Sequence, residues 1–414
     1  MSAKSIIVVG AGICGVSTAI WLLRSGHEVT LIDKDGPAAG ASFGNAGLLA
    51  KWAVDPVTSP RLWRDAPGYL LNRDSGLFLS GANALRALPW LARFLSHATD
   101  RETRRIVGHL APLLEDTVEQ HRALVAGTTL ERWICDSKMG FAYSNLRALQ
   151  KDAYSWARKG ELGLVPEVLT GGAVQEEEPI LSPVIGCLAV LSGQGHILDP
   201  GGYITALVDH FVAEGGRFLK AELLDIHRAG GRISHVDTSL GVITCGALVL
   251  TTGIWSKGLM AKLGLNIPLQ AERGYHVIFE NPSETPRNPL LMMEGKFGVN
   301  PMEIGLRCAG TLEYAPHEAA PRADPIALLK RQAAKAFPGM TYSGTREWVG
   351  SRPSLPDSLP MIGEINRSGI YTGFGHQHVG LTTGPKTGRL IAQMISGGGV
   401  NLNLAPYAPE RYTR

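Results

Sequence analysis

The first 33 residues constrain the fold of this chain more than any other segment. Residues 5–9 are almost all β-branched and have the length of a strand, and a Gly-x-Gly-x-x-Gly turn follows over residues 10–15. An apolar-periodic segment then runs to about Ser25, which is typical of a helix. Residues 28–32 indicate a second strand, so the beginning of the chain predicts a strand–turn–helix–strand unit with parallel strands.

The three glycines of this turn have distinct roles in nucleotide binding. Gly10 permits the tight turn, Gly12 lets the backbone approach a pyrophosphate, and Gly15 lets the helix pack closely on the strand. The start of the helix offers N–H groups and a positive dipole end to phosphates. Asp33 follows Gly15 by eighteen residues, where a carboxylate accepts hydrogen bonds from a ribose; Asp35 in that role, with Asp33 capping a turn, is the alternative. We therefore predict a dinucleotide-binding unit.

The composition indicates a globular protein of two domains. The chain has 414 residues, of which 44% are hydrophobic and 19% charged, and its formal net charge of +3 is not gathered into a basic tail or stripe. We expect no nucleic-acid partner. The five cysteines have neither a CxxC pair nor a metal-ligand spacing, so we expect reduced thiols in a cytoplasmic protein and no metal site.

One uncharged segment raises the question of a membrane anchor. Residues 6–23 contain no charged side chain and follow Lys4, a pattern shared with signal peptides and short anchors. The glycines of the phosphate turn lie inside this segment, and no small-residue cleavage site follows it. We therefore expect no transmembrane helix.

The rest of the chain alternates between helical and strand patterns. Two helical segments indicate a cap, at residues 85–94 and 103–125. Strands of a second sheet are predicted at residues 141–143, 186–190, 275–279 and 304–310. An α/β pattern returns with a helix at 200–214, a strand at 216–219, a hairpin arm at 241–245 and a buried strand at 247–252. The last of these is expected to be a central strand of the nucleotide-binding sheet.

Several widely separated segments together resemble a known family. They are residues 41–47, 251–256, 348–353, 360–363 and 373–382, and the similarity extends over nearly the whole chain. With the N-terminal glycine turn, they resemble the D-amino-acid oxidase superfamily, and within it the bacterial D-amino-acid dehydrogenase branch. The resemblance implies FAD as the cofactor.

The resemblance also implies the fold and its division along the chain. It predicts an α/β fold with a Rossmann-like FAD-binding domain and a discontinuous α+β substrate (cap) domain that contains a mixed antiparallel sheet. The FAD-binding domain would comprise residues 1–90, 198–262 and 345–414, and the cap residues 91–197 and 263–344.

Residues expected to contact the cofactor are assigned from the glycine motif and from the family resemblance. The motif itself gives Gly10, Gly12, Gly15 and Asp33. The resemblance adds Ser42, Asn45, Ala46, Gly47, Leu223, Thr252, Gly253, Gly375, Gly380, Leu381 and Thr382. A helix predicted at 381–395 would direct N–H groups and its positive dipole end at the flavin ring, although these glycines also fit a simple strand-to-helix crossover.

The substrate site is expected around Arg352, in the Gly-x-Arg-Pro motif that grips the substrate carboxylate in related proteins. A planar guanidinium binds both carboxylate oxygens at once. Tyr275 is expected to donate to the same carboxylate or to form the pocket wall, and Asn45 to face the substrate. At least one of His376 and His378 should point into the pocket. For Arg352 the alternative is a structural salt bridge, and for each histidine it is a hydrogen bond to the backbone or exposure to solvent.

The resemblance implies oxidation of a small D-amino or imino acid, including the D-proline or hydroxyproline type. Hydride would pass from Cα to flavin N5, and the imine would hydrolyse to a 2-oxo acid and ammonia when the amine is primary. The electron acceptor would be a quinone, another carrier or oxygen. The expected location is cytoplasmic or peripheral on the inner face of the membrane. Residues 296–300 depart from relatives that place a substrate-contacting tyrosine there. A glycine or sarcosine oxidase-like activity and a dinucleotide-binding redox scaffold without amine chemistry are the alternatives.

Overall fold

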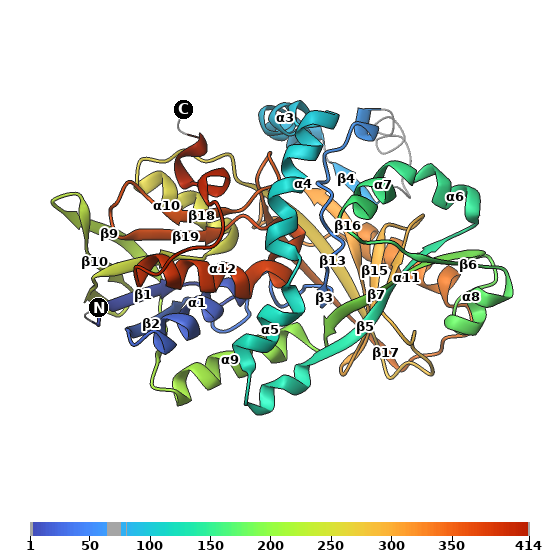
Figure 1. Ribbon diagram of the computed structural model, residues 1–414, viewed down its shortest axis with the longest axis horizontal. Helices are drawn as coiled ribbons and strands as arrows, with labels where there is room; N and C mark the ends of the chain where they lie inside the picture. The colour runs from blue at the N-terminus through green and yellow to red at the C-terminus, as the bar shows by residue number, and fades with distance from the viewer. Residues whose placement is uncertain (1–2, 64–75, 80, 413–414) are drawn as a thin grey trace.

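The computed structural model describes residues 3–63, 76–79 and 81–412. Two β-sheets dominate the molecule, one in each half of Figure 1, with the helix α4 (Asp100–Leu114) crossing between them. The sheet on the left contains both the beginning and the end of the described chain. The sheet on the right comes mostly from the middle of the sequence.

The left-hand sheet is built on the N-terminal unit predicted from the sequence. β1 (Ser5–Val9) pairs in parallel with β2 (Glu28–Asp33) on one side and with β12 (Ala247–Leu250) on the other, and α1 (Ile13–Arg24) connects the first two strands. The strand order is β18-β19-β12-β1-β2-β8, in which the outer strands are β8 (Arg217–Lys220), β19 (Ile370–Phe374) and β18 (Met361–Glu364). β12 is therefore an interior strand, as expected.

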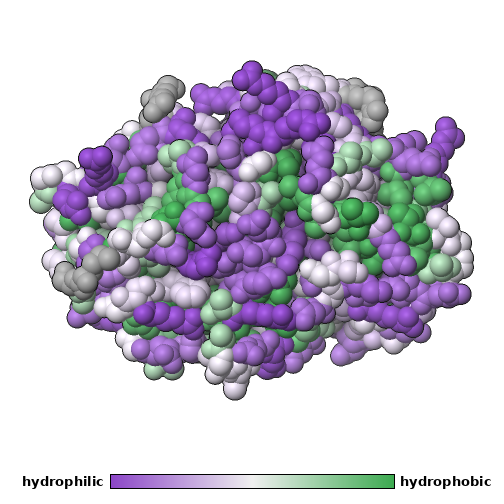
Figure 2. All heavy atoms as spheres, viewed as in Figure 1, coloured by the Kyte–Doolittle hydropathy of each residue, from purple (hydrophilic) through white to green (hydrophobic). Residues whose placement is uncertain are grey.

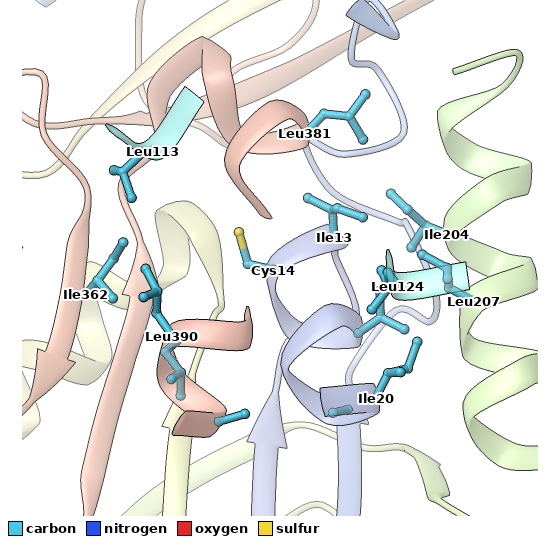
Figure 3. Packing of buried hydrophobic residues seen from close by; sticks show 14 of the residues in the cluster. Ile13, Cys14, Ile20, Leu113, Leu124, Ile204, Leu207, Ile362, Leu381 and Leu390 are labelled. Atoms are coloured by element: carbon cyan, nitrogen blue, oxygen red, sulfur yellow. The ribbon is translucent and has the colours of Figure 1, made fainter. Parts of the chain in front are cut away.

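Helices cover one face of this nucleotide-binding sheet. α1, α9 (Pro200–Ala213) and α12 (Gly380–Ile395) share a hydrophobic core with the inward side chains of β1 and β2. Figure 3 shows Cys14 of α1 between this helix and α12, with Leu381 and Leu390 on the α12 side and Ile204 and Leu207 on the α9 side.

A second core lies on the opposite face of the same sheet. It contains side chains of α10 (Ser256–Lys262) and of a small antiparallel sheet, which comprises β9 (Leu223–Ala229), β10 (Arg232–Thr238) and β11 (Gly241–Thr244). The sequence predicted the β11 arm and did not identify β9 or β10.

The right-hand sheet is the larger one and is mostly antiparallel. Its order is β17-β13-β16-β15-β14-β5-β7-β3, with β4 paired to β16 and β6 paired to β7. The strands are β3 (Leu48–Leu49), β4 (Leu77–Leu79), β5 (Ile134–Tyr143), β6 (Glu167–Thr170), β7 (Cys187–Ile197), β13 (Gln270–Glu280), β14 (Leu290–Met292), β15 (Phe297–Met302), β16 (Gly305–Tyr314) and β17 (Gly344–Ser354). This mixed sheet and the parallel nucleotide-binding sheet together give the expected fold class.

The large sheet has two chemically different faces. Side chains alternate along a strand, so neighbouring residues of β13 point to opposite sides. Tyr275 and Val277 pack in the core beneath α11 (Ala323–Ala336). The residues between them, Gly274 and His276, face the nucleotide-binding half, and Glu272 continues this row. The site described below lies on that second face.

The remaining helices surround these sheets. They are α3 (Gly81–Ser96), α5 (Thr117–Val125), α6 (Leu146–Lys151), α7 (Ala153–Glu161) and α8 (Gly172–Glu177). Short 3₁₀ turns occur at Thr129–Trp133, Gly253–Trp255, Gln377–Val379, Ala405–Tyr407 and Pro409–Tyr412.

The segment expected to be helical over residues 103–125 forms two helices, α4 and α5, with a break at residues 115–116. In a continuous helix the Pro112 carbonyl would accept from the backbone N–H of Asp116. The Lys386 ammonium donates to that carbonyl instead and also pairs with the Asp116 carboxylate at 2.8 Å. A distant residue therefore divides the helix, which local periodicity does not reveal.

The division of the chain into domains stays a prediction. β3 and β4 belong to the stretch assigned to the FAD-binding domain, yet both are strands of the large sheet. β17 also lies in that sheet and begins at the boundary expected near residue 345.

No helix in the described part of the chain is long and apolar enough to cross a membrane. The face shown in Figure 2 is mostly hydrophilic, with several separate hydrophobic patches.

Candidate active site

A cavity of about 1110 Å³ lies between the nucleotide-binding sheet and the free face of the large sheet. Its wall includes the glycine turn, the loop at residues 39–46, the ends of β12 and β19, strands β13 and β17, and the start of α12. A pocket for a drug-sized ligand occupies about 300–1,000 Å³. The cavity is thus large enough for a dinucleotide together with a small substrate.

The glycine turn lies at the cavity with its backbone uncovered. A Cβ on Gly10, which has a φ of +103°, would lie 2.6 Å from the Thr251 carbonyl oxygen, and one on Gly15 would lie 1.7 Å from the Gly10 carbonyl oxygen. A Cβ on Gly12 would meet only the Ser42 side chain, at 3.0 Å. Gly10 and Gly15 are therefore required by the protein itself, whereas Gly12 leaves open the space that a pyrophosphate needs.

Two side chains complete this end of the cavity. The Asp33 carboxylate accepts hydrogen bonds from the backbone N–H groups of Ala11, Asp35 and Gly36 at 2.8–3.0 Å, and it lines the cavity. An ionised carboxylate has about four acceptor positions, so one remains for a ribose hydroxyl. The Ser42 hydroxyl accepts from the Ile13 N–H at 3.2 Å, at the first residue of α1. α1 carries no acidic residue in its first turn, which suits an anion at this helix end.

Most of the residues predicted to contact the cofactor line this one cavity. Besides Gly10, Gly12, Asp33 and Ser42, the lining includes Asn45, Ala46, Leu223, Thr252, Gly253, Gly375, Gly380, Leu381 and Thr382. Gly15 and Gly47 lie behind the wall. Gly47 has a φ of +80°, and a Cβ there would lie 2.5 Å from the Asn300 side chain, so its role is close packing.

The start of α12 points at the same space. Gly380, Leu381 and Thr382 line the cavity, and the first turn of the helix contains no acidic side chain. The Thr382 hydroxyl donates to the Leu48 carbonyl and accepts from the Ala50 N–H, which ties the helix to the strand β3 and the residues after it. The positive end of the helix dipole is thereby fixed at the cavity.

Arg352 extends from β17 into the cavity, and its guanidinium lies over Gly274 of the neighbouring strand. A Cβ at residue 274 would lie 2.3 Å from a guanidinium nitrogen, so the arginine needs a glycine there. No hydrogen bond or ion pair joins this guanidinium to another residue of the described chain. Burial lowers the pKa of Arg352, an effect that nearby Glu272 opposes. A half-buried guanidinium that lines a cavity and has no ion-pair partner fits a site that binds an anion.

The carboxylate of Glu272 lies in the same wall and was not predicted from the sequence. Glu272 is directly opposite Arg352 in the β13–β17 register and opposite Tyr314 in the β13–β16 register. It is 3% exposed and accepts a hydrogen bond from the Tyr314 hydroxyl at 3.0 Å. Burial raises the pKa of Glu272, while Arg352 and Tyr314 lower it. One anion and one cation thus face the cavity side by side without forming an ion pair.

Tyr275 contributes to the wall, but its hydroxyl is engaged elsewhere. It donates to the Glu313 carboxylate at 2.5 Å, and Glu313 also accepts from Arg273 at 2.8 Å. Burial, and then this hydrogen bond, raise the pKa of Tyr275 to about 12. These contacts favour the wall role of Tyr275 over donation to a substrate carboxylate.

The two histidines after β19 have different surroundings. His376 is buried, with Nε2 3.0 Å from the Thr387 hydroxyl and Nδ1 3.7 Å from the Cys14 sulfur, so both ring nitrogens have partners. His378 lines the cavity near Arg352, and its ring is surrounded by protein while remaining accessible from the cavity. Burial lowers the pKa of His376 to about 3, and burial together with Arg352 lowers the pKa of His378 to about 4. Of the two, His378 is the one available to a substrate.

Because the folded-state pKa of His378 is depressed, its ring should be neutral throughout the range from pH 6 to pH 9. We expect His378→Gln to leave the shape of the pH profile of kcat/KM unchanged over this range, whatever its effect on the absolute value. A kinetic pKa near 6.5 that disappears in this variant would contradict the assignment.

Arg307 holds the loop at residues 41–47 against the large sheet. It is fully buried in β16 and donates to the backbone carbonyls of Phe43 and Asn45. The Asn300 amide donates to the Ala46 carbonyl at 2.9 Å, and the Ile197 N–H to the Gly47 carbonyl at 2.7 Å. This loop carries Asn45, which was predicted to contact both cofactor and substrate.

Beyond Arg352 and Glu272, the cavity wall becomes apolar. Residues of α3, β4 and β16 form this part together with Leu62, namely Leu77, Leu79, Leu91, Phe94, Leu95 and Leu312. The α3 helix was expected in a cap, but sequence periodicity did not show which of its residues would reach the cavity.

A nucleotide-binding unit that faces a mixed sheet across one cavity is the architecture of an enzyme that holds a dinucleotide and a substrate together. The chain belongs to the DAO family of FAD dependent oxidoreductases, whose family model matches residues 5–394. FAD is accordingly its cofactor. This confirms the resemblance found in the sequence and the expected cofactor.

Individual relatives are similar to this chain over their full length. The chain is 36% identical to a D-amino-acid oxidase of Bradyrhizobium diazoefficiens and 29% identical to a D-amino acid dehydrogenase of a Methylobacterium species, with 99% of both chains covered in each case. Its fold is similar to that of a glycine oxidase from Geobacillus kaustophilus, with a TM-score of 0.78 at 20% identity and 99% coverage of both chains.

Proposed function

We propose that this protein oxidises a small D-amino or imino acid at its α-carbon and that the resulting imine hydrolyses to a 2-oxo acid and ammonia when the amine is primary. The observation that carries the proposal is the half-buried Arg352 guanidinium, which lies in the wall of the cavity that the glycine turn also lines. The names of the relatives, D-amino-acid oxidase and D-amino acid dehydrogenase, support the same substrate class.

The predicted contact residues divide between cofactor and substrate. Gly10, Gly12, Asp33, Ser42, Leu223, Thr252, Gly253 and the segment 375–382 would hold FAD along the nucleotide-binding half of the cavity. When bound, FAD supplies the two-electron acceptor for the hydride that leaves the substrate α-carbon. Arg352 would bind both oxygens of the substrate carboxylate and so fix the position of the α-carbon.

Glu272 gives the site a partner for the other charge of an amino acid. The α-carboxylate and α-ammonium of a zwitterion are close together, as are Arg352 and Glu272 on neighbouring strands. Arg352 would take the carboxylate and Glu272 the ammonium. The Glu272 carboxylate is also placed to accept the proton that the ammonium must lose before the neutral amine can be oxidised.

The apolar end of the cavity bears on the choice of substrate. Glycine and sarcosine have no side chain beyond the α-carbon, so an oxidase for them needs no apolar chamber. Here Leu77, Leu91 and Phe94 lie in the wall beyond the Arg352–Glu272 pair. This favours a substrate with an apolar side chain or ring over glycine or sarcosine. The presence of both a cation and an anion in the wall, Arg352 and Glu272, argues against a redox scaffold without amine chemistry.

A substrate screen tests this proposal directly. The holoenzyme is incubated with D-amino, L-amino and cyclic imino acids, with an artificial dye as acceptor and oxygen uptake measured alongside. We expect turnover with D-amino or imino acids that carry apolar side chains. Turnover restricted to glycine and sarcosine, or none with any amine, would contradict the proposal.

The same screen identifies the class of acceptor, which we propose to be a quinone, another carrier or oxygen. The resemblance to the dehydrogenase branch predicts that dye-linked turnover exceeds oxygen-linked turnover. Hydrogen peroxide production in air at a rate equal to the dye rate would instead indicate an oxidase. A cytoplasmic location, with peripheral contact at the inner face of the membrane when the acceptor is a quinone, is part of this proposal.

The direction in which Glu272→Gln changes KM tests whether Glu272 binds the substrate ammonium. If Glu272 binds the substrate ammonium, KM should rise about ten- to a hundredfold, which corresponds to about 1.4–2.7 kcal/mol. If Glu272 only balances the charge of Arg352, its removal should strengthen carboxylate binding and lower KM. Steady-state kinetics with the best substrate of the screen distinguish the two results.

Glu178→Gln is the matched control for this variant. Glu178 is also a buried glutamate, at 1% exposure, and burial likewise raises its pKa, but it accepts hydrogen bonds from Arg287 and Asn288 away from the cavity. We expect this variant to keep the KM of the wild type. FAD content is measured in both variants, since a loss there would indicate a general disturbance of the fold.

A further inference from the structure

Four titratable side chains share one face of the β9–β10 hairpin. His227 and His235 are directly opposite each other in the register, and Asp225 and Asp237 form the next pair that points the same way. On the other face of the hairpin, Ile226 and Val236 pack into the core beneath the nucleotide-binding sheet. The hairpin lies at the left edge of Figure 1, and none of these four polar residues lines the cavity.

Three of these side chains converge. The Nε2 atom of His227 lies 2.7 Å from the Asp237 carboxylate, and the rings of His227 and His235 are stacked at 8° with centroids 4.4 Å apart. Each residue offers one ligand atom, and these atoms lie within 4.8 Å of one another. Asp225 takes part in other contacts, with the Ile226 N–H at 2.9 Å and the Lys262 ammonium at 3.8 Å.

We propose that His227, His235 and Asp237 bind one divalent transition-metal ion, with Zn²⁺ the best match. Two imidazole nitrogens and one carboxylate oxygen are a ligand set that zinc accepts, with a fourth position left for water. A tetrahedral zinc ion with bonds of about 2.0–2.1 Å needs ligand atoms roughly 3.4 Å apart. The two rings are now parallel, so one of them must turn for both to direct a nitrogen lone pair at the same ion. The side chains of His227 and Asp237 are 40% and 39% exposed, which leaves them free to turn and to close the remaining distance by rotation about their side-chain bonds.

A neighbouring hydroxyl supports this arrangement. The Ser234 hydroxyl lies 3.0 Å from Nδ1 of His235, and it donates to the His227 carbonyl at 3.1 Å. Metal-binding histidines usually have such a partner on the second ring nitrogen, which orients the ring and leaves the other nitrogen for the metal. Here Nε2 of His235 is the nitrogen that remains.

The site has a structural consequence. β9 begins at Leu223, which lines the cavity beside Glu222. A metal ion bound to one residue of β9 and two of β10 would fasten the hairpin that supports this part of the wall. Because the ion binds the folded hairpin, it should stabilise the folded protein in proportion to the logarithm of its concentration.

The test uses the FAD-loaded enzyme, freed of metal by a chelator and then titrated with ZnCl₂ in a calorimeter. We expect one equivalent of zinc to bind and the melting temperature to rise with the zinc concentration. In His235→Ala and in His227→Ala, affinity should fall about tenfold or more. CuCl₂ provides a second readout, since electron paramagnetic resonance of the copper complex should show coupling to two imidazole nitrogens in the wild type and to one in either variant.

His97→Ala is the matched control. His97 also pairs with a carboxylate, with its Nδ1 2.9 Å from Glu102, but among the described residues it belongs to no cluster with a second histidine. This variant should bind one equivalent of zinc with wild-type affinity. Absence of binding up to about millimolar zinc, which corresponds to about 4.1 kcal/mol, would overturn the proposal. So would binding that persists when His227 and His235 are both replaced by alanine.

Discussion

Arg352→Ala is expected to lower kcat/KM for the best amino-acid substrate by about thirty- to several-thousand-fold. Truncating one partner of a buried, charge-assisted pair costs about 2–5 kcal/mol, and here the lost partner would hold the substrate carboxylate. Arg352→Lys should recover only part of the loss, because an ammonium keeps the charge without the planar fork. Steady-state kinetics of the FAD-loaded variants provide the measurement.

The controls separate substrate binding from stability. FAD content should stay normal in both Arg352 variants, because the residue is proposed to contact substrate. Arg411→Lys is the matched variant outside the cavity: Arg411 is paired with Asp357 at 2.8 Å, so its change should reduce thermal stability and leave KM unaltered. If Arg352→Ala loses FAD while the surviving holoenzyme keeps its KM, the proposed substrate site is misplaced.

Gly12→Val is expected to yield a folded protein without FAD. A Cβ at this position would come no closer to described protein atoms than 3.0 Å, the distance to the flexible Ser42 side chain. The substitution should therefore be tolerated by the protein and should obstruct the pyrophosphate. The flavin absorbance of the purified variant, with far-ultraviolet circular dichroism to monitor folding, gives the answer.

Gly15→Ala is the contrasting variant. Its Cβ would lie 1.7 Å from the Gly10 carbonyl oxygen and 2.6 Å from the Thr251 hydroxyl, so α1 could not keep its place on β1. We expect low solubility and loss of secondary structure, with FAD loss as a consequence.

For the Gly12→Val variant, normal FAD content would show that the pyrophosphate does not pass Gly12.

The parts of the fold that were predictable are those in which local sequence and tertiary packing agree. The β-branched residues of β1, the glycine turn and the apolar stripe of α1 all specify the same unit, and its strand bounds match the prediction. At the break between α4 and α5, Lys386, more than 260 residues away, binds the Pro112 carbonyl and the Asp116 carboxylate, a contact that apolar periodicity does not reveal. β9 and β10 were missed because irregularities in their pairing, between Ile233 and His235 and between Asp237 and Thr238, interrupt the usual alternation.

The residues of the candidate site likewise include some that the sequence could locate and others that it could not. Motif residues such as Gly12 and Asp33 could be located because their spacing along the chain reflects their function. Glu272 could not, since its importance arises from being opposite Arg352 across two strands that are distant in sequence. The same holds for His227 and Asp237, whose spacing along the chain resembles no metal motif. Cross-strand register is information that a single sequence does not contain.

The clamp that Arg307 and Asn300 form on the loop at residues 41–47 limits how this enzyme can open. The loop leads away from the nucleotide-binding half, yet its carbonyls are bonded to strands of the large sheet. A hinge motion that parted the two halves would break several of these buried hydrogen bonds at once. The same loop is held to α1 through the Ser42 hydroxyl and the Ile13 N–H. We therefore expect the two halves to move together and a substrate to enter by a local displacement at the rim, so that the spacing between the two reactants is preserved from one turnover to the next.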